Sequence, residues 1–206
     1  MRRAVVLAMA LTGLAGAVFL FGRSGGSDDG PLSAGLPSFY GQPLPVGGTA
    51  TAGHVRLFNE GDEPAAIERV RLLGVTDGLE FIEVRTRLFP QEPTFIGMLG
   101  FPPTDPMYSS SRSLEEQGEV PAPKTFNAAG EPDEGMQLVI GVRAPRPGVA
   151  RSRGVEVTYR VGERQYREVY QHEIYLCVPA EAFGGDDCPG SRHREQFDDR
   201  SANPIR

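Results

Sequence analysis

Short segments in which apolar and polar residues alternate place the strongest limit on how this chain can fold. Six of them lie at residues 54–58, 65–73, 79–88, 136–142, 155–161 and 174–178. Alternation with a period of two is typical of a β-strand that has one buried face and one wet face. Turn-forming residues separate the segments, since 26 of the 206 residues are glycine and 18 are proline. We therefore predict an all-β fold.

The best-defined local structure is a β-hairpin whose two-residue turn begins at Gly162. Glycine readily adopts the positive φ that such a turn requires. The turn fixes the register of the two strands, so Tyr159 is expected opposite Tyr166, and Val155 opposite Tyr170. These aromatic and branched side chains then share the buried face, where cross-strand pairs stabilise a sheet most.

Residues 39–188 are expected to form one domain of about seven or eight strands. Segments 54–58 and 65–73 flank an acidic stretch with turn chemistry at 59–64, which predicts a second hairpin. Many short strands separated by turns, without a long helical period, favour an antiparallel β-sandwich of the immunoglobulin-like kind. A closed β-barrel is the alternative.

Residues 89–135 follow no strand pattern. This segment is 47 residues long and holds eight of the prolines. A loop of that length inside a compact domain is uncommon and is usually functional or disordered. We expect its first third to pack on the sandwich, with one further strand at 94–99, and residues 109–133 to be mobile. The tail at 189–206 mixes charges without periodicity, which predicts disorder.

The amino terminus has the features of a membrane span. Residues 4–22 carry no charge and lie between Arg3 and Arg23. As a helix this run covers about 28 Å, close to the thickness of a bilayer core. Residues 1–23 are therefore predicted to form a single transmembrane helix. A cleaved signal peptide is the alternative, because Ala15-Gly16-Ala17 provides the small residues that a signal peptidase needs.

The charges that flank the span predict its orientation. Arg2 and Arg3 precede the span and favour retention inside, whereas the first charges after Arg23 are acidic. The carboxyl-terminal domain is thus expected outside the cytoplasm, held at the cell membrane by the span, or secreted if the span is cleaved. Residues 24–38 are rich in Gly, Ser, Asp and Pro and are predicted to be a flexible linker.

The two cysteines of the chain, Cys177 and Cys188, are predicted to form a disulfide. An even pair in an exported chain is usually oxidised. The bond would tie the carboxyl segment to the last predicted strand. The ten residues between the cysteines lack the CxxC geometry that lowers a thiol pKa, so a redox role is not expected.

The sequence contains no catalytic or metal-binding motif that we recognise. His54, His172 and His193 lie on separate predicted elements, without the spacing of a metal site. There is no GxSxG elbow and no Gly-rich phosphate loop between a strand and a helix. We therefore expect no cofactor and no enzyme activity. The many acidic residues leave one alternative, an anchored hydrolase that uses a carboxylate pair.

Four arginines form the candidate interaction surface of the chain. They are Arg69, Arg71, Arg85 and Arg87. They occupy polar positions of two neighbouring predicted strands and would attract an anionic partner, such as a phospholipid headgroup or an acidic polymer. Glutamates neighbour them, so ordinary cross-strand charge pairing is the alternative. Nucleic acid is not an expected partner, because 27 acidic and 21 basic residues give the chain a formal charge of −6.

Two strings in the sequence point to a group of related proteins. They are VRLFNEGDEPAAIERVRL at 55–72 and VEVTYRVGERQYREVYQHEIYLC at 155–177. They resemble segments of exported bacterial proteins that carry a membrane anchor followed by an immunoglobulin-like domain. The resemblance brings no catalytic residues with it. From the whole sequence we expect a binding or accessory module of the cell envelope, with an envelope protein as its partner. A small-solute-binding ectodomain is a further alternative, which predicts an enclosed apolar pocket under residues 89–135.

Overall fold

The computed structural model describes residues 30–35, 37–76, 78–90, 97–104, 110–126, 132–183 and 188. The predicted membrane span at 1–23 and the predicted tail at 189–206 lie outside these residues. Within the described ranges, no helix has the length and apolar character needed to cross a bilayer.

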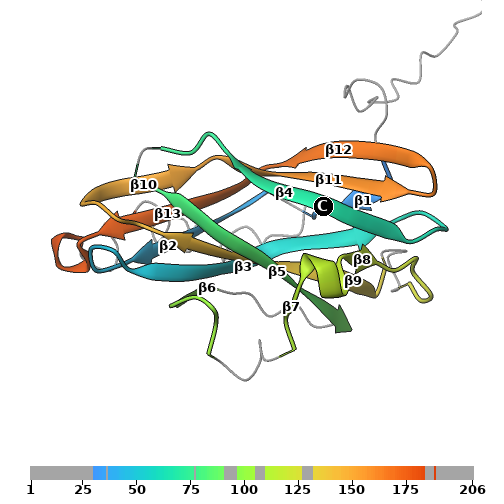
Figure 1. Cartoon of the computed structure of the whole chain (residues 1–206), viewed down its shortest axis with the longest axis horizontal. Coiled ribbons are helices and arrows are strands. Elements are labelled where there is room, and N and C mark those ends of the chain that lie inside the picture. The colour runs from blue at the N-terminus through green and yellow to red at the C-terminus, as the bar shows by residue number, and fades with distance from the viewer. Residues whose placement is uncertain are drawn as a thin grey trace, which may run out of the picture.

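Strands dominate the described part of the chain, as the sequence predicts (Figure 1). They are β1 (Leu32–Ser33), β2 (Ser38–Pro43), β3 (Thr49–Asn59), β4 (Ala65–Leu73), β5 (Glu80–Pro90), β6 (Gly97–Leu99), β7 (Arg112–Ser113), β8 (Glu119–Val120), β9 (Glu134–Arg143), β10 (Gly148–Ser152), β11 (Gly154–Val161), β12 (Arg164–Tyr170) and β13 (His172–Val178). The helical elements described are one turn of α-helix, α1 (Leu114–Gln117), and one 3₁₀ turn at Ala180–Ala182. The all-β prediction is confirmed.

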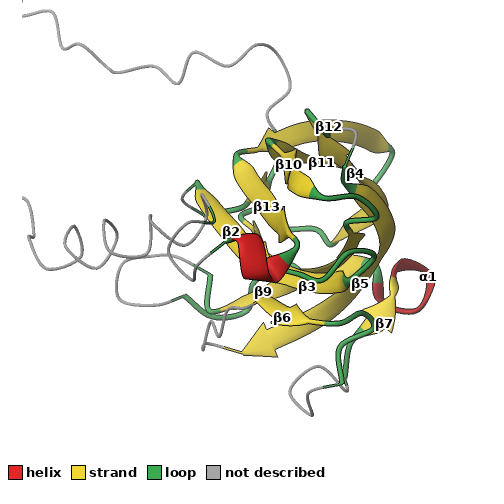
Figure 2. Ribbon diagram, turned by 90° about the vertical axis from the view of Figure 1, so that its left-hand side faces the viewer, coloured by secondary structure: helices red, strands yellow, loops and turns green. Residues whose placement is uncertain are grey.

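The strands form three sheets around one hydrophobic core. The largest has the order β1-β3-β9-β5-β7, with β6 also paired to β3; the others have the orders β10-β13-β2 and β12-β11-β4-β8. All described pairs are antiparallel except β2 with β13. Figure 2 shows β3, β5 and β9 on one side of the molecule and β10, β11 and β12 on the other. This two-layered arrangement is consistent with a β-sandwich, whose buried side chains come from both layers.

The hairpin predicted at Gly162 has the expected register. Gly162 has a φ of 56°, and β11 and β12 pair with Tyr159 opposite Tyr166 and Val155 opposite Tyr170. The rings of Tyr159 and Tyr166 stack with their centroids 5.3 Å apart. Tyr159 is fully buried, which confirms that the alternation along this strand reports its core face.

This hairpin continues through β10 and β13 and thereby joins two sheets. β10 pairs with β13 up to Ser152 and Ile174, and β11 pairs with β12 from Val155 and Tyr170. Between these two pairs the first arm has two residues and the second arm has three. The arms thus differ by one residue where the pairing is interrupted between the two sheets. The outer half can therefore pair with β4 while the inner half pairs with β2.

The second predicted hairpin, between 54–58 and 65–73, is wrong. β3 pairs with β9 on one edge and with β1 and β6 on the other, whereas β4 pairs with β11 and β8 in a different sheet. The turn-forming segment 59–64 instead carries the chain from one layer of the fold to the other. The side chain of Asn59 fixes this crossover: its Nδ2 donates to the backbone carbonyl of Glu63 at 2.8 Å, and its Oδ1 accepts from the Gly61 N–H at 2.9 Å.

The predicted linker at 24–38 ends earlier than the sequence indicates. β1 pairs with the end of β3, and Leu32 is only 3% exposed. The Leu32 N–H donates to the hydroxyl of Tyr159 at 3.2 Å, and the Leu32 carbonyl accepts from the hydroxyl of Tyr170 at 3.1 Å. The folded part of the chain therefore includes residues from Gly30 onward. The two tyrosine hydroxyls satisfy the backbone of Leu32, as a neighbouring strand would do in a longer β-ladder.

The described parts of the 89–135 segment are built into the fold. β6 confirms the end of the strand expected at 94–99 and pairs with β3. The expectation of a mobile stretch at 109–133 is wrong for its described residues: β7 pairs with β5, β8 pairs with β4, and Val120 is fully buried. A capping box between Ser113 and Glu116 begins α1. Sequence periodicity missed these pieces because each is only two to four residues long.

Candidate anion-binding face

The structure separates the four arginines that the sequence placed together. Arg69 and Arg71 lie on β4, in the four-stranded sheet, whereas Arg85 and Arg87 lie on β5, in the largest sheet. The separation follows from the chain path, since β4 and β5 are consecutive in sequence but do not pair. Arg69 and Arg71 therefore form a pair that is separate from Arg85 and Arg87.

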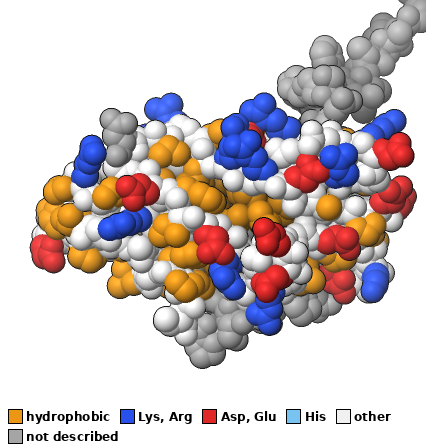
Figure 3. Space-filling view, in the orientation of Figure 1, with side chains coloured by type: hydrophobic (Ala, Val, Ile, Leu, Met, Phe, Trp, Pro, Cys, Tyr) orange, Lys and Arg blue, Asp and Glu red, His pale blue; other side chains and the backbone are white. Residues whose placement is uncertain are grey.

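Two further arginines, Arg160 on β11 and Arg167 on β12, share the outer face with the β4 pair. The register places Thr158 opposite both Arg69 and Arg167, so these three side chains form one row across the sheet. Figure 3 shows a group of basic side chains over the part of the molecule where Figure 1 places β4, β11 and β12. The sequence carried a signal for Arg167, because the predicted hairpin register already sets it opposite Thr158.

Glu156 is the electrostatic centre of this face. Its carboxylate lies 2.6 Å from Nη2 of Arg71 and accepts a 2.6 Å hydrogen bond from Nε of Arg167, whose Nη2 also contacts the same oxygen. The Glu156 side chain is 4% exposed, but those of Arg71 and Arg167 are 41% and 66% exposed. Burial disfavours the charged carboxylate, yet the bonds and charges of Arg167 and Arg71 outweigh it and lower the pKa of Glu156.

A second ion pair forms toward the hairpin turn. Glu68 is the extra residue where the pairing of β4 with β11 shifts, and its carboxylate accepts from Nε of Arg160 at 2.8 Å. The amide of Gln165 also donates to Glu68. This bond from Gln165 and the Arg160 contact lower the pKa of the Glu68 carboxyl. Arg160 is thus neutralised locally.

The remaining positive charge gathers in a shallow depression that we call the arginine basin. It is lined by Arg69, Arg71, Glu156, Thr158, Gln165, Tyr166 and Arg167 and has a volume of about 260 Å³. Within the described ranges Arg69 is exposed and makes no ion pair or hydrogen bond, and Nε of Arg71 is buried without a partner. Three arginines and one glutamate give the basin a formal charge of +2, in a chain whose total is −6.

The histidines make a different kind of cluster. His172 Nδ1 lies 2.6 Å from Oγ of Ser38, and its Nε2 lies 3.1 Å from the carbonyl of Ala34. The ring of His54 meets that of His172 edge-on at 5.6 Å, and neither ring nitrogen of His54 has a hydrogen-bond partner in the described structure. Burial, and then the charge of His172, lowers the pKa of His54 to about 3. His193 lies outside the described residues.

The described residues contain no group of three His, Cys, Asp or Glu side chains placed to hold a metal ion. The carboxyls whose pKa departs from its ordinary value there are Glu68, Glu116 and Glu156, and all three are lowered. A general acid needs the opposite direction. A second depression, of about 380 Å³, is lined by Thr76, Gly78 and residues 146–150.

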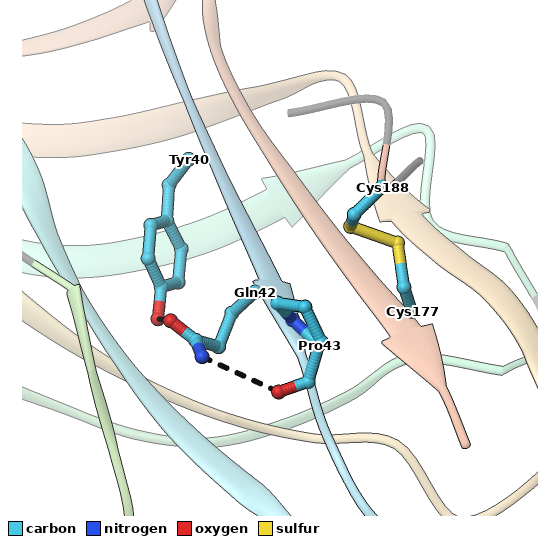
Figure 4. Close-up of a disulfide and its surroundings, with 5 residues drawn as sticks. All are labelled: Tyr40, Gln42, Pro43, Cys177 and Cys188. Atoms are coloured by element: carbon cyan, nitrogen blue, oxygen red, sulfur yellow. Dashed lines mark hydrogen bonds between the residues drawn. A yellow bond between two sulfur atoms is a disulfide. The ribbon is translucent and has the colours of Figure 1, made fainter. Parts of the chain in front are cut away.

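The predicted disulfide joins Cys177, on β13, to Cys188 (Figure 4). Both cysteines are fully buried, and their Cα atoms are 5.8 Å apart. The bond lies beside β2, where the hydroxyl of Tyr40 donates to the amide oxygen of Gln42 at 3.1 Å. Full burial of both cysteines is typical of a structural bond.

Comparison with known proteins does not add to this description. No protein-family model matches the chain, and no curated protein sequence matches it either. We therefore infer function from the geometry and charge of the arginine basin and from the sequence at the amino terminus.

Proposed function

We propose that this chain is a membrane-anchored, extracytoplasmic binding or accessory module of the cell envelope, whose arginine basin contacts an anionic partner and which carries out no catalysis. The observation that carries the proposal is the +2 basin on an acidic chain. Cationic side chains clustered on one face give a protein an attractive field for anions even when its total charge is negative. Arg69 supplies a guanidinium that no described acid neutralises.

The position of the basin on an open sheet face supports binding rather than catalysis. The side chains that line it come from β4, β11 and β12, and those strands expose it to solvent on one side. Glu156 and Glu68 are ionised and paired with arginines, so neither is available as a general acid. A flat, charged and shallow surface suits contact with a larger partner, from which it binds a single anionic group.

The envelope location rests on the sequence of the amino terminus and on the disulfide. Residues 4–22 are uncharged and follow two arginines, and an oxidised cysteine pair persists best outside the cytoplasm. We include the immunoglobulin-like sandwich in the proposal, with its two layers around one core. A reporter enzyme that folds only outside the cytoplasm, fused after Arg206, tests this placement: we expect activity in the membrane fraction, and a full-length fusion that is made but inactive would overturn it.

The binding proposal is tested with the full-length chain in nanodiscs of neutral lipid. Polyphosphate and poly-glutamate serve as polyanions, and neutral dextran as the reference. The variant R69Q/R167Q removes two basin charges, and R85Q/R87Q removes two charges of the same kind on β5. We expect the basin variant to weaken polyanion binding by about tenfold or more, since each charge-assisted contact is worth more than a neutral one. The β5 variant should bind as the natural chain does.

Two results would contradict this function. One is equal loss of binding in both double variants, which would mean that only total charge matters. The other is no binding of either polyanion above the dextran reference at low ionic strength, where electrostatic attraction is strongest.

A further inference from the structure

We propose that the arginine basin recognises a phosphate monoester, with Arg69, Thr158 and Arg167 as the residues that contact it. This inference rests on the proposed function and narrows it to one ligand chemistry. Three features of the basin lead to it: the row that these residues form, the carboxylate that the basin already holds, and the charge that remains.

The row places donors on three sides of one point. Thr158 lies in the middle strand, and its direct neighbours across the sheet are Arg69 on β4 and Arg167 on β12. Neighbouring strands are about 4.8 Å apart, so side chains at these three positions are within reach of one bound group. A tetrahedral phosphate has three free oxygens, which can meet a hydroxyl below and a guanidinium on each flank. A planar carboxylate has only two oxygens.

The position that suits a carboxylate is already taken by Glu156. Nε and Nη2 of Arg167 both contact one oxygen of Glu156, and Nη2 of Arg71 contacts the other. The donors that remain for a ligand lie on different side chains: the guanidinium of Arg69, Nη1 of Arg167 and the hydroxyl of Thr158. They do not form a second planar fork. A ligand that accepts from several directions therefore fits them better than one that needs a paired, coplanar approach.

Charge and size agree with this ligand. The basin carries +2, and a phosphate monoester carries close to −2 at neutral pH. The volume of about 260 Å³ lies below the range of pockets that enclose drug-sized molecules. The basin thus holds one charged group and leaves the rest of the molecule outside. Such a group occurs on phosphorylated sugars and on lipid headgroups that end in a phosphate.

Titrations of the full-length chain in neutral nanodiscs test the proposal. The probes are glucose 6-phosphate, inorganic phosphate and acetate at matched ionic strength, with binding followed by calorimetry. We expect both phosphates to bind at least about tenfold more tightly than acetate. Their additional oxygen accepts one more hydrogen bond from the basin, and a hydrogen bond to a charged group contributes more than a neutral one. Vesicles of phosphatidic acid and of neutral phosphatidylcholine distinguish the sources. Capture by phosphatidic acid indicates a lipid, and binding of the sugar phosphate alone indicates a soluble group; either supports the proposal.

Variants of the row separate this inference from the broader one. Thr158→Val keeps the shape and removes only the hydroxyl, and we expect it to weaken phosphate binding by about tenfold while acetate binding stays the same. Arg69→Gln should weaken it at least as much, and Arg85→Gln should leave it within about twofold. Phosphate and acetate that bind equally, or a T158V chain that binds phosphate as the natural chain does, would overturn the phosphate proposal. Polyanion binding lost in R69Q/R167Q would then still support the proposed function.

Discussion

Arg71 and Glu156 face each other across β4 and β11, with Nη2 of the arginine 2.6 Å from a carboxylate oxygen. They are 85 positions apart in sequence, and the pairing of β4 with the carboxyl-terminal hairpin brings them together. Because Arg167 approaches the same carboxylate from the other strand, Glu156 links all three strands of the outer face. The Glu156 carboxylate therefore contributes to the stability of the sheet and also holds two arginines of the basin in position.

The first prediction concerns this carboxylate. Glu156→Gln should lower the free energy of unfolding by about 1–3 kcal/mol, since it weakens charge-assisted bonds to two arginines at a position sheltered from water. Urea unfolding followed by circular dichroism measures the change. Glu163→Gln, at the exposed hairpin turn, removes the same charge and should have almost no effect. An E156Q chain as stable as E163Q would show that the arginine contacts contribute nothing to folding.

The sequence was sufficient for structures whose determinants are local. The hairpin at Gly162 was predictable to the residue, because its turn and its two alternating arms are contiguous. The Cys177–Cys188 bond was predictable from the even number of cysteines and the expected export of the chain. The crossover between β3 and β4 was not, since a turn that reverses a chain looks the same whether the next strand pairs with the last one or enters another sheet.

Only some residues of the arginine basin could be predicted from the sequence. Arg69 and Arg71 were selected because they occupy polar positions of a strand, but the same criterion selected Arg85 and Arg87, which lie in another sheet. Which arginines gather depends on sheet order, a property of long-range pairing. The role of Glu156 was also hidden, since an acidic residue on a wet strand face gives no sign that two arginines from neighbouring strands will cover it.

The second prediction is a loss of stability in mild acid that depends on His54. Its pKa is about 3 in the folded chain, against 6.5 ordinarily, so the unfolded chain binds this proton first as the pH falls. The protonation of His54 therefore leaves the free energy of unfolding unchanged above pH 6.5 and lowers it progressively between pH 6.5 and 3. The loss at pH 5 is about 2 kcal/mol. Burial and then the charge of Arg56 lower the pKa of His172 as well, so its effect has the same sign.

His54→Phe isolates this term, because the ring nitrogens of His54 have no described hydrogen-bond partner to lose. Unfolding free energies at pH 7.5 and pH 5 should differ by about 2 kcal/mol less in this variant than in the natural chain. Ser38→Ala, which removes the neighbour of His172 instead, serves as the control. An unchanged difference in H54F would mean that the protonation of this side chain does not oppose folding.

The third prediction concerns the disulfide. Its cysteines are 11 positions apart, and closing a loop of that length restricts the unfolded chain enough to contribute about 3 kcal/mol in the chain-entropy account. Reductant should therefore shift the urea midpoint of the natural chain to lower concentration. A C177A/C188A chain should be destabilised similarly and should not respond to reductant. If reductant leaves the natural chain unaffected while mass spectrometry shows free thiols, the bond makes no contribution to stability.

The fourth prediction concerns the start of the fold, where the hydroxyl of Tyr159 accepts from the Leu32 N–H and donates to the carboxylate of Glu168. Burial and then the bond to Glu168 raise the pKa of Tyr159, so the hydroxyl stays protonated at any physiological pH. Tyr159→Phe removes both bonds and leaves the Leu32 N–H without its partner. We expect a loss of about 1–3 kcal/mol, together with faster hydrogen exchange at the Leu32 amide.

Tyr166→Phe is the matched control for Tyr159→Phe, because the two rings stack and Tyr166 also packs against the core, but the described structure gives the hydroxyl of Tyr166 no hydrogen bond. This variant keeps the stack and should change stability by less than about 0.5 kcal/mol. Exchange at the Leu32 amide should remain slow in Y166F and become fast in Y159F. Equal exchange in the two variants would mean that β1 is held by its pairing with β3 alone, since the hydroxyl bond is the difference between them.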